Sequence, residues 1–483
     1  MNSPVIVWFR LDLRIEDNPA LLAARKSGNP VIPVFIWSPD EEGNWQPGSA
    51  SRVWLYHALK SLQSDLQALD CGLLLLNGPC HYALEQLISK TGATQVFWNR
   101  CYEPCAIGRD SRIKEKLQKS GIKVRSFNAN LLFEPHEIRN KQDKPYKVFT
   151  PFWRQYQALE IEKPLKSDRG RLPAVNTRVD SASLEEFGLL PKIKWHTGIM
   201  ENWDMSAHAG GEQVRKFISR SLQDYIKCRD IPSLDKVSLI SPYLHFGQVS
   251  ARQIWHMVLQ DEQQDGRITP AGTSEGYLRQ LVWREFAYHL LFHFPHSTDK
   301  PLFERYAGFP WARSAKKQLA CWQRGETGYP IVDAGMRQLW HSGWMHNRVR
   351  MITGSFLTKD LLVHWKKGAE WFWDTLVDAD LANNTMGWQW VAGCGADAAP
   401  YFRIFNPVTQ GERFDPDGAY VRKWIPELKG LEDRYIHQPW NAPGKLLSNA
   451  GIRLGKTYPE PLVNHAEARR RALDTYSSFK QGM

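Results

Sequence analysis

Tryptophan is the residue type whose number and placement in this sequence most strongly suggest chemistry. The chain contains 21 tryptophans, and twelve of them lie between Trp283 and Trp440. Because indole rings bury a large apolar area, most of them are expected in a core. A concentration of this kind also suits a site where planar rings are stacked or electrons are moved.

Polar side chains recur beside these indoles at helical spacing. Asp380, Asn384 and Trp388 follow one another at four-residue steps, so a helix would present all three on one face. Metal chemistry is not indicated, because Cys101 and Cys105 have no second close pair and no His-Glu-x-x-His motif is present. The sequence therefore predicts a helical site without a metal ion.

Composition and charge limit the classes of protein to which this chain can belong. Lys and Arg number 62 against 51 Asp and Glu, which gives a formal net charge of +11. A basic chain suits a polyanionic partner such as nucleic acid, although a solvated surface has the same composition. With 42% hydrophobic and 23% charged residues, the chain is not of the disordered or collagen-like class.

Further sequence features bear on the cellular setting. No apolar run approaches the roughly 18 residues that a membrane span needs. The N-terminus leads directly into the apolar run from Val5 to Phe9 without a basic leader, so we expect a cytoplasmic protein. Seven scattered cysteines favour reduced thiols over a disulfide framework. Nothing indicates a protein partner, and we expect a monomer.

The first 130 residues alternate between apolar runs and helical patterns. The apolar, β-branched runs cover residues 5–9, 31–37, 73–76, 96–98 and 122–127. Ser51 to Leu69 repeats apolar residues at three- and four-residue steps, as an amphipathic helix does. Such alternation predicts parallel strands with right-handed crossovers, hence a doubly wound α/β domain over residues 1–132. The Gly-x-Gly-x-x-Gly motif of dinucleotide sites is absent after the first run.

The rest of the chain has two parts that differ in composition and in periodicity. From about Lys163 to Met205 the sequence is charged and contains prolines without periodicity, so residues 133–205 are expected to be a surface connector. Helical periodicity then dominates, and residues 206–483 are expected to be an all-helical domain. The helices expected there are 212–225, 250–259, 275–293, 331–341, 347–361 and 369–381.

Several blocks of this sequence resemble the photolyase and cryptochrome family. They are Trp8-Phe9-Arg10 with Asp12-Leu13-Arg14, Trp283-Arg284-Glu285-Phe286, Thr327 to Ala334, Gly343 to Arg348, Asp378 to Trp390, and Tyr401 to Pro407. The blocks cover nearly the whole chain in order. Within the family the sequence looks most similar to microbial cyclobutane pyrimidine dimer photolyases of the class I and III branch.

The resemblance implies cofactors, a partner and a reaction. It implies FAD in a bent shape inside the helical domain, an antenna chromophore at the α/β domain, and UV-damaged DNA docked over the flavin. Light would excite the reduced flavin, one electron would pass to the dimer, the cyclobutane ring would split and the electron would return. Of the family's antennae, the branch resembled here favours methenyltetrahydrofolate over a deazaflavin.

The resemblance also assigns residues to the flavin. By this match Asn384 faces flavin N5, and Asp378 with Arg350 forms an ion pair beside the ring. The family's usual Thr-Ser pair near the phosphates reads Val237-Ser238, which removes one hydroxyl and leaves more to backbone N–H groups. The implied cofactor-binding set is Tyr225, Ser238, Leu239, Ile240, Ser241, Arg284, Arg350, Asp378, Asp380 and Asn384.

A further set is implied for the lesion and the DNA. Trp283 and Trp390 resemble two indoles that enclose an extruded dimer, and base-flipping enzymes as a group include photolyases. The implied catalytic set is Gln280, Asn347, Met351 and Asn384. The implied DNA-binding set is Arg229, Trp283, Arg348, Trp390, Arg403 and Gln410.

Gln280 departs from the family pattern, because dimer photolyases normally hold a glutamate there. Glutamine keeps the length and an NH2 donor but supplies neither a carboxyl proton nor a negative charge. Photolyases for (6-4) lesions and animal cryptochromes carry this glutamine, together with a histidine at the position of Asn347. The asparagine therefore keeps a cyclobutane dimer ahead of a (6-4) lesion as the expected substrate.

Two remaining sets concern electrons and light. Trp388, Trp365 and Trp311 match a relay that carries electrons to the flavin, with a one-residue length difference before Trp322 at the third position. The antenna contacts are expected at Asn99, Tyr102 and Glu103. The iron–sulfur branch is disfavoured because its cluster needs four cysteines in the helical domain, where this chain has Cys228, Cys321 and Cys394.

Three functions on this scaffold remain as alternatives to dimer repair. One is a blue-light receptor without turnover, which Asn384 disfavours because plant receptors tend to have aspartate there. The second is a (6-4) photolyase, and the third is a basic flavoprotein that only binds nucleic acid. Fold does not decide among them, because function lies in the sites.

Overall fold

The computed structural model describes residues 3–166, 170–173, 179–264, 272–398 and 403–482. Tyr401 and Phe402, which open the last family-like block, lie outside the described residues. Within the described ranges, no helix is both long and apolar enough to cross a bilayer.

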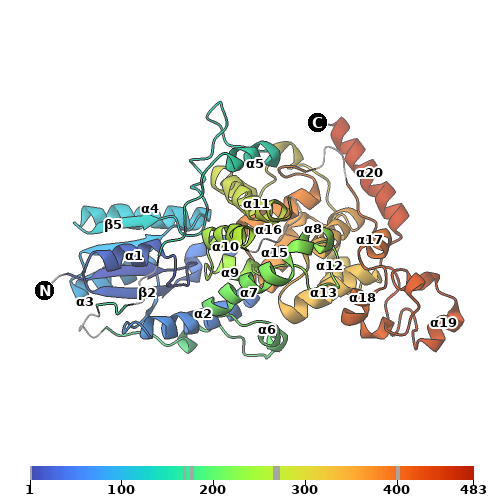
Figure 1. Ribbon diagram of the computed structural model, residues 1–483. Helices are drawn as coiled ribbons and strands as arrows, with labels where there is room; N and C mark the ends of the chain where they lie inside the picture. The colour runs from blue at the N-terminus through green and yellow to red at the C-terminus, as the bar shows by residue number, and fades with distance from the viewer. Residues whose placement is uncertain (1–2, 167–169, 174–178, 265–271, 399–402, 483) are drawn as a thin grey trace.

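The N-terminal part of the chain forms one parallel sheet covered by helices (Figure 1). The strands are β1 (Val5–Phe9), β2 (Val31–Trp37), β3 (Leu74–Asn77), β4 (Gln95–Asn99) and β5 (Lys123–Phe127), in the order β3-β2-β1-β4-β5. The central strand β1 pairs Val5 with Val31 on one side and with Gln95 on the other. All five β1 residues are buried, as expected for a strand covered on both faces. The predicted doubly wound α/β domain is confirmed.

The helices around this sheet follow the strands in sequence. They are α1 (Pro19–Lys26), α2 (Ser49–Gln67), α3 (Cys80–Thr91) and α4 (Pro104–Lys119), with a 3-10 segment η1 (Pro39–Trp45) before α2. The winding direction reverses between β1 and β4, and such a switch point leaves a crevice at the carboxyl ends of the strands. A cavity opens in this crevice.

Among the residues that the structure describes, the C-terminal part contains helices and no strand (Figure 1). Its longer helices are α7 (Ala207–Arg220), α10 (Ala251–Gln264), α11 (Thr273–His293), α13 (Pro330–Ser342), α15 (Trp365–Thr375), α16 (Leu381–Ala392) and α20 (His465–Gln481). Its shorter helices are α8 (Tyr225–Cys228), α9 (Ser241–His245), α12 (Lys316–Arg324), α14 (Asn347–Ser355), α17 (Pro407–Phe414), α18 (Ala419–Trp424) and α19 (Gly444–Asn449). The predicted all-helical domain is confirmed.

Four expected helices differ from the observed ones, and one of them, expected over 250–259, continues to Gln264 as α10. The helix expected over 369–381 is wrong, because α15 ends at Thr375 and the Asp380 carboxylate accepts from the Asn383 N–H to start α16. An aspartate at this point begins a helix rather than continuing one. The helix expected over 347–361 ends at Ser355 and continues as a π-helical turn, and α7 ends at Arg220 rather than at Tyr225.

The segment expected to be a connector contains two helices, α5 (Phe149–Gln157) and α6 (Thr197–Asn202). Phe149, Phe152, Trp153 and Tyr156 of α5 recur at helical spacing and are buried. Their side chains share one apolar cluster with Val282 and Phe286 of α11, and α5 lies beside α11 in Figure 1. Hydrophobic burial therefore holds this part of the segment on the helical domain.

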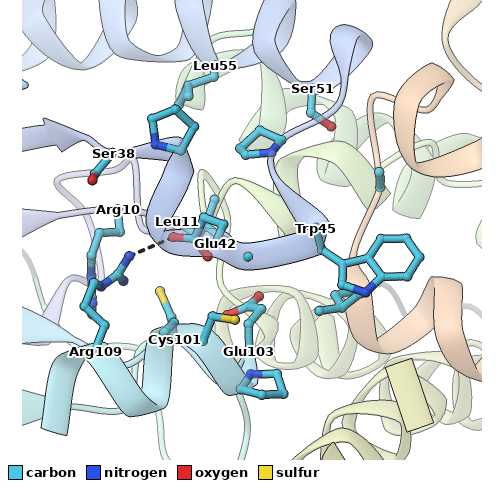
Figure 2. Close-up of a pocket in the computed structure, with 18 of the residues that line it drawn as sticks. Arg10, Leu11, Ser38, Glu42, Trp45, Ser51, Leu55, Cys101, Glu103 and Arg109 are labelled. Atoms are coloured by element: carbon cyan, nitrogen blue, oxygen red, sulfur yellow. Dashed lines mark hydrogen bonds and ion pairs between the residues drawn. The ribbon is translucent and has the colours of Figure 1, made fainter. Parts of the chain in front are cut away.

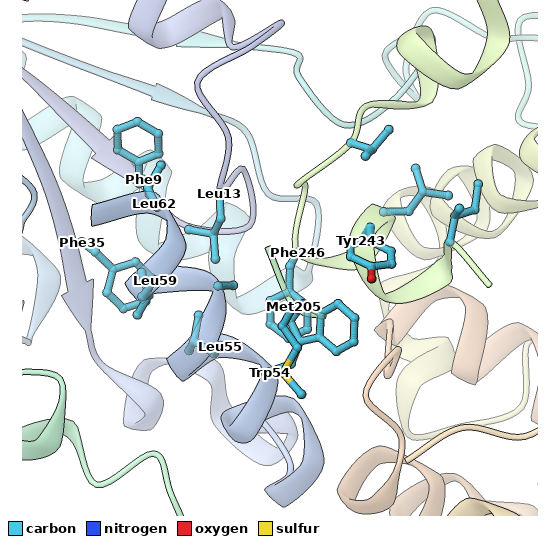
Figure 3. Close-up of a cluster of buried hydrophobic side chains, with 14 of the residues drawn as sticks. Phe9, Leu13, Phe35, Trp54, Leu55, Leu59, Leu62, Met205, Tyr243 and Phe246 are labelled. Atoms are coloured by element: carbon cyan, nitrogen blue, oxygen red, sulfur yellow. The ribbon is translucent and has the colours of Figure 1, made fainter. Parts of the chain in front are cut away.

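One apolar core joins the two domains (Figure 3). Trp54 of α2 is completely buried, stacks on Phe246 at 5.9 Å and meets Tyr243 edge-on at 5.0 Å. Its indole N–H donates to Gln248 Oε1 at 2.8 Å. Truncating such a ring to alanine costs about 3–5 kcal/mol of folding free energy. The core therefore fixes the crevice of the sheet against the helical domain.

Candidate functional site

An ion pair anchors the loop between α15 and α16. Arg350 Nη2 donates to both carboxylate oxygens of Asp378, at 3.0 and 2.8 Å. Ser241 Oγ donates to the same carboxylate at 2.6 Å, and Arg350 Nε donates to the Met345 carbonyl at 2.7 Å. The buried charge of Asp378 is thus paired and hydrogen-bonded, as a buried carboxylate must be. Three of the predicted cofactor residues meet at this point.

The predicted phosphate segment has a fixed and strained backbone. Leu239 has a φ of 54°, in the left-handed region that costs a side-chain-bearing residue about 1 kcal/mol or more. Gln213 Nε2 donates to the Ser238 carbonyl at 2.9 Å. The rings of Tyr225 and Tyr277 meet edge-on at 5.2 Å nearby on α8 and α11. Strain held in place by neighbours is typical of ligand clamps.

A second buried carboxylate, Asp380, caps α16. Its Oδ1 accepts from the backbone and side-chain nitrogens of Asn383, at 2.8 and 2.7 Å. Its Oδ2 accepts from the Tyr288 hydroxyl and lies 3.9 Å from His245 Nδ1. Burial opposes ionisation, but the His245 side chain and the Arg284 cation outweigh it and hold the pKa of Asp380 below its usual range. Asp380 is therefore a fixed negative charge.

Asn384 and Trp388 continue the same helix face, as predicted. Asn384 Nδ2 donates to the Ala369 carbonyl at 3.0 Å, which leaves the amide oxygen to accept from another group. Trp388 is 4% exposed and packs against α15, where a Cβ on Gly368 would overlap its indole. Glycine at 368 is therefore what lets α15 and α16 approach so closely.

The three tryptophans predicted as a relay all lie in or beside α15. Trp365 is 1% exposed and stands one turn before Gly368, which the Trp388 indole contacts. The His364 ring lies 5.5 Å from the Trp365 ring and 5.3 Å from the Trp311 ring. Trp311 is half-buried and Trp388 is buried, so of the two Trp311 is the one nearer to solvent. His364, the N-cap of α15, was not predicted, since histidine is not among the residues preferred at that position.

The predicted lesion residues form a polar surface across α8, α11 and α14. Arg229 Nη2 donates to Gln280 Oε1 at 3.1 Å, while Gln280 Nε2 donates to the Gly276 carbonyl at 3.2 Å. Arg348 Nη2 pairs with Asp230 Oδ2 at 2.8 Å. Asn347 is exposed, and its Nδ2 lies 3.9 Å from Met351 Sδ.

The other DNA residues come from three further places. Trp283 is half-buried on α11, and its ring stacks on Phe149 at 3.5 Å with an interplanar angle of 6°. Trp390 is half-buried on the last turn of α16, Gln410 is half-buried on α17, and Arg403 is exposed just before α17. Their contacts with DNA stay predictions.

A cavity of about 460 Å³ opens where the two domains meet (Figure 2). It lies at the carboxyl ends of β1, β2 and β4, at the switch point of the sheet. His245, Ala379 and Leu381 reach it from the helical side, so the cavity adjoins the loop that carries Asp378 and Asp380. Four indoles line it, those of Trp8, Trp37, Trp45 and Trp373.

Charged groups ring one end of this cavity. The Arg10 guanidinium lies 4.5 Å from the Trp8 ring centroid and pairs with Asp110, and Arg109 Nη1 donates to Glu42 Oε1 at 2.7 Å. Glu103 also lines the cavity, and burial raises the pKa of its carboxyl to about 7. Its protonation therefore changes near neutral pH.

Of the three predicted antenna residues, Glu103 alone is among the residues that line the cavity. Asn99 Nδ2 donates to Asp12 Oδ2 at 2.6 Å, and the Tyr102 hydroxyl donates to Glu134 at 2.8 Å. The polar groups of both side chains are thus already hydrogen-bonded to other residues of the protein. The lining indoles were not predicted, because they come from four separate segments and no local spacing connects them.

Comparisons with known proteins identify the family to which the chain is similar. Residues 5–168 match the family model described as DNA photolyase, and residues 277–478 match the FAD binding domain of DNA photolyase. The deoxyribodipyrimidine photo-lyase of Agrobacterium fabrum is 46% identical over 481 residues, covering 99% of each chain. Cryptochrome-2 of Arabidopsis thaliana is 39% identical over 492 residues, covering 100% of this chain and 80% of that protein. The crystal structure of a bacterial class III photolyase from Agrobacterium tumefaciens superimposes with a TM-score of 0.95 and 46% identity, covering 100% of this chain and 98% of that one.

The fold and the site define a two-domain protein whose helical half is an FAD-binding domain. The chain belongs to the photolyase and cryptochrome family. The resemblance inferred from the sequence blocks is thereby confirmed.

Proposed function

We propose that this protein is a deoxyribodipyrimidine photolyase, which uses light to split cyclobutane pyrimidine dimers in DNA. One observation carries the proposal: the cofactor residues and the lesion residues share the helices α11, α14 and α16. A full-length relative with 46% identity bears the same enzyme name.

The helical site fits FAD. The ionised Asp380 and the Asn384 amide oxygen are acceptors for the N–H groups of a flavin ring, and the Asp378–Arg350 pair balances local charge. Ser238 to Ser241 would hold the phosphates through the fixed turn around Leu239. Bound and reduced, FAD supplies the electron that light drives into the dimer.

The chain's own residues would bind and orient the lesion. Gln280 is held by Arg229 and stands one turn from Trp283 on α11, so an extruded dimer would meet an amide and an indole together. Asn347 and Met351 would contact it from α14. Arg229, Arg348 and Arg403 would bind phosphates, and binding should weaken steeply with salt because counterions are released. The enzyme would act as a monomer in the cytoplasm.

For the antenna we propose methenyltetrahydrofolate in the cavity between the domains. Its indole lining suits a flat pterin ring, which stacks on aromatic faces. Arg10 and Arg109 would face the carboxylates of the folate tail, and Glu103 would face a ring nitrogen. Reconstitution with the folate should add a near-UV absorption band, and binding of a deazaflavin instead would replace this assignment.

A blue-light receptor is the second candidate, because Cryptochrome-2 of Arabidopsis thaliana covers the whole of this chain at 39% identity. Pre-reduced protein illuminated with a dimer-containing oligonucleotide separates the two. Loss of the dimer supports repair. Binding without conversion supports a receptor or a flavoprotein that only binds nucleic acid.

A further inference from the structure

Three side chains from two helices form a continuous stack at the edge of the lesion face. The Phe149 ring of α5 lies parallel to the Trp283 ring, with centroids 3.5 Å apart and an angle of 6°. The Arg279 guanidinium lies 5.3 Å from the Phe149 centroid. Arg279 and Trp283 are four residues apart on α11, so both reach Phe149 from the same side of that helix.

Phe149 itself is fixed from several directions. It is 1% exposed, and its backbone N–H donates to Asp397 Oδ2 at 3.0 Å. A second contact at the other end of α5 joins Gln157 Nε2 to Glu275 Oε1 of α11 at 3.2 Å. The ring therefore cannot shift without moving α5 against α11.

The fixed Phe149 ring favours stacking of a base on the open part of Trp283. One face of the indole is occupied by Phe149, and the half-buried Trp283 keeps part of its surface open to solvent. An indole already held in one orientation loses little conformational entropy when a base stacks on it. Arg279 is exposed, and among the described residues no carboxylate pairs with it. A guanidinium stacked on a ring keeps its N–H edge for a phosphate.

We propose that Phe149 is a positioning residue that holds Trp283 ready to stack on the extruded dimer. Arg279, held over the same ring, contacts a DNA phosphate beside the lesion. This inference rests on the proposed function. It gives α5, in the segment expected to be a passive connector, a direct part in recognition.

The two residues make different and separable contributions to binding. Phe149 acts on the lesion alone, so Phe149→Leu should lower the ratio of affinities for dimer-containing and undamaged oligonucleotides by about tenfold. Its salt dependence should stay unchanged. Arg279→Gln should weaken both oligonucleotides alike and reduce the slope of log K against log salt concentration by about 0.9.

Two control variants keep the test independent of folding. Phe152→Leu removes a ring of the same helix that packs on Tyr156 and Phe286, and should leave the affinity ratio unchanged. Phe149→Tyr keeps the aromatic ring, so its ratio of affinities for the two oligonucleotides should equal that of the unaltered protein. Thermal unfolding and the flavin absorption of each variant would show that the fold and the cofactor are retained.

The experiment titrates fluorescent 14-base duplexes, with and without one dimer, into the FAD-loaded protein in the dark at several salt concentrations. An affinity ratio for Phe149→Leu equal to that of the unaltered protein overturns the positioning role, and an unchanged salt slope for Arg279→Gln overturns the phosphate contact. If the unaltered protein itself does not distinguish the two duplexes, the proposed function fails, and the inference fails with it.

Discussion

Breaking the ion pair between Asp378 and Arg350 should weaken the retention of FAD and also lower the free energy of unfolding of the protein. The substitution Asp378→Asn keeps the size of the side chain and removes its charge. Arg350 then loses the negative charge that it faces and one of the two oxygens that it now contacts at 3.0 and 2.8 Å, while the remaining amide oxygen can still accept from Ser241. The pair also joins α14 to the loop before α16, so the change reaches the helix that carries Asn384.

The size of the effect follows from burial. The Asp378 side chain is 4% exposed and that of Arg350 is 24% exposed. Removing one partner of a fully buried pair costs about 3–5 kcal/mol. Because the guanidinium is partly solvated, we expect about 2–3 kcal/mol here. For a chain of 483 residues this lowers the midpoint of thermal unfolding by about 2–3 °C.

Thermal unfolding of the FAD-loaded protein, followed by near-UV circular dichroism and flavin fluorescence, measures both consequences. The Asp378→Asn variant should release FAD at a lower temperature than it unfolds. A matched control is Glu427→Gln, which breaks the Arg337–Glu427 contact of 2.6 Å, whose side chains are each 26% exposed. This substitution should lower the free energy of unfolding by less than Asp378→Asn does and leave the temperature of FAD release unchanged. An Asp378→Asn variant with unaltered FAD retention and stability would refute the assigned role of the pair.

Three further predictions concern the reaction and its pH dependence. Gln280→Glu should raise the number of dimers split per absorbed photon, since it restores the family's usual carboxyl group, and an equal or lower yield counts against that role. Trp388→Phe should abolish photoreduction of oxidised FAD while sparing repair by pre-reduced enzyme, and surviving photoreduction means that the relay is assigned wrongly. Burial raises the pKa of Glu285 to about 7, so ionising this carboxyl destabilises the folded protein increasingly from about pH 4.5 to pH 7. Glu285→Gln should therefore gain up to about 3 kcal/mol relative to the unaltered protein between pH 5 and pH 8 in denaturant titrations, and a pH-independent difference would exclude this carboxyl as the cause.

The sheet was predictable from the sequence because buried parallel strands are nearly continuous apolar runs. Val5 to Phe9 and Val31 to Trp37 begin and end where the patterns predict. The break between α15 and α16 was harder to predict, because apolar periodicity continues through it. The break depends on the Asp380 carboxylate, which is held by Tyr288 and Asn383 through contacts that periodicity does not report.

Some parts of the candidate site were predictable from the sequence and others were not. Asn384 and Trp388 share a helix face because their spacing alone requires it. The Asp378–Arg350 pair depends on long-range packing that only the family resemblance indicated, and the Ser241–Asp378 and Arg229–Gln280 contacts were not predicted. The cavity was the least predictable feature, because the indoles that line it, Trp8, Trp37, Trp45 and Trp373, come from separate segments that no local spacing connects.

Repair requires that the helical domain hold FAD close enough to an extruded dimer for light to drive an electron between them. The most direct measurement loads the protein with FAD, reduces it chemically, adds an oligonucleotide with one cyclobutane dimer and illuminates it with near-UV to blue light. We predict recovery of the 260 nm absorbance of the separated pyrimidines, dependent on both light and reduced FAD. A protein that takes up FAD and binds the oligonucleotide, yet leaves the dimer intact under illumination, would contradict the account.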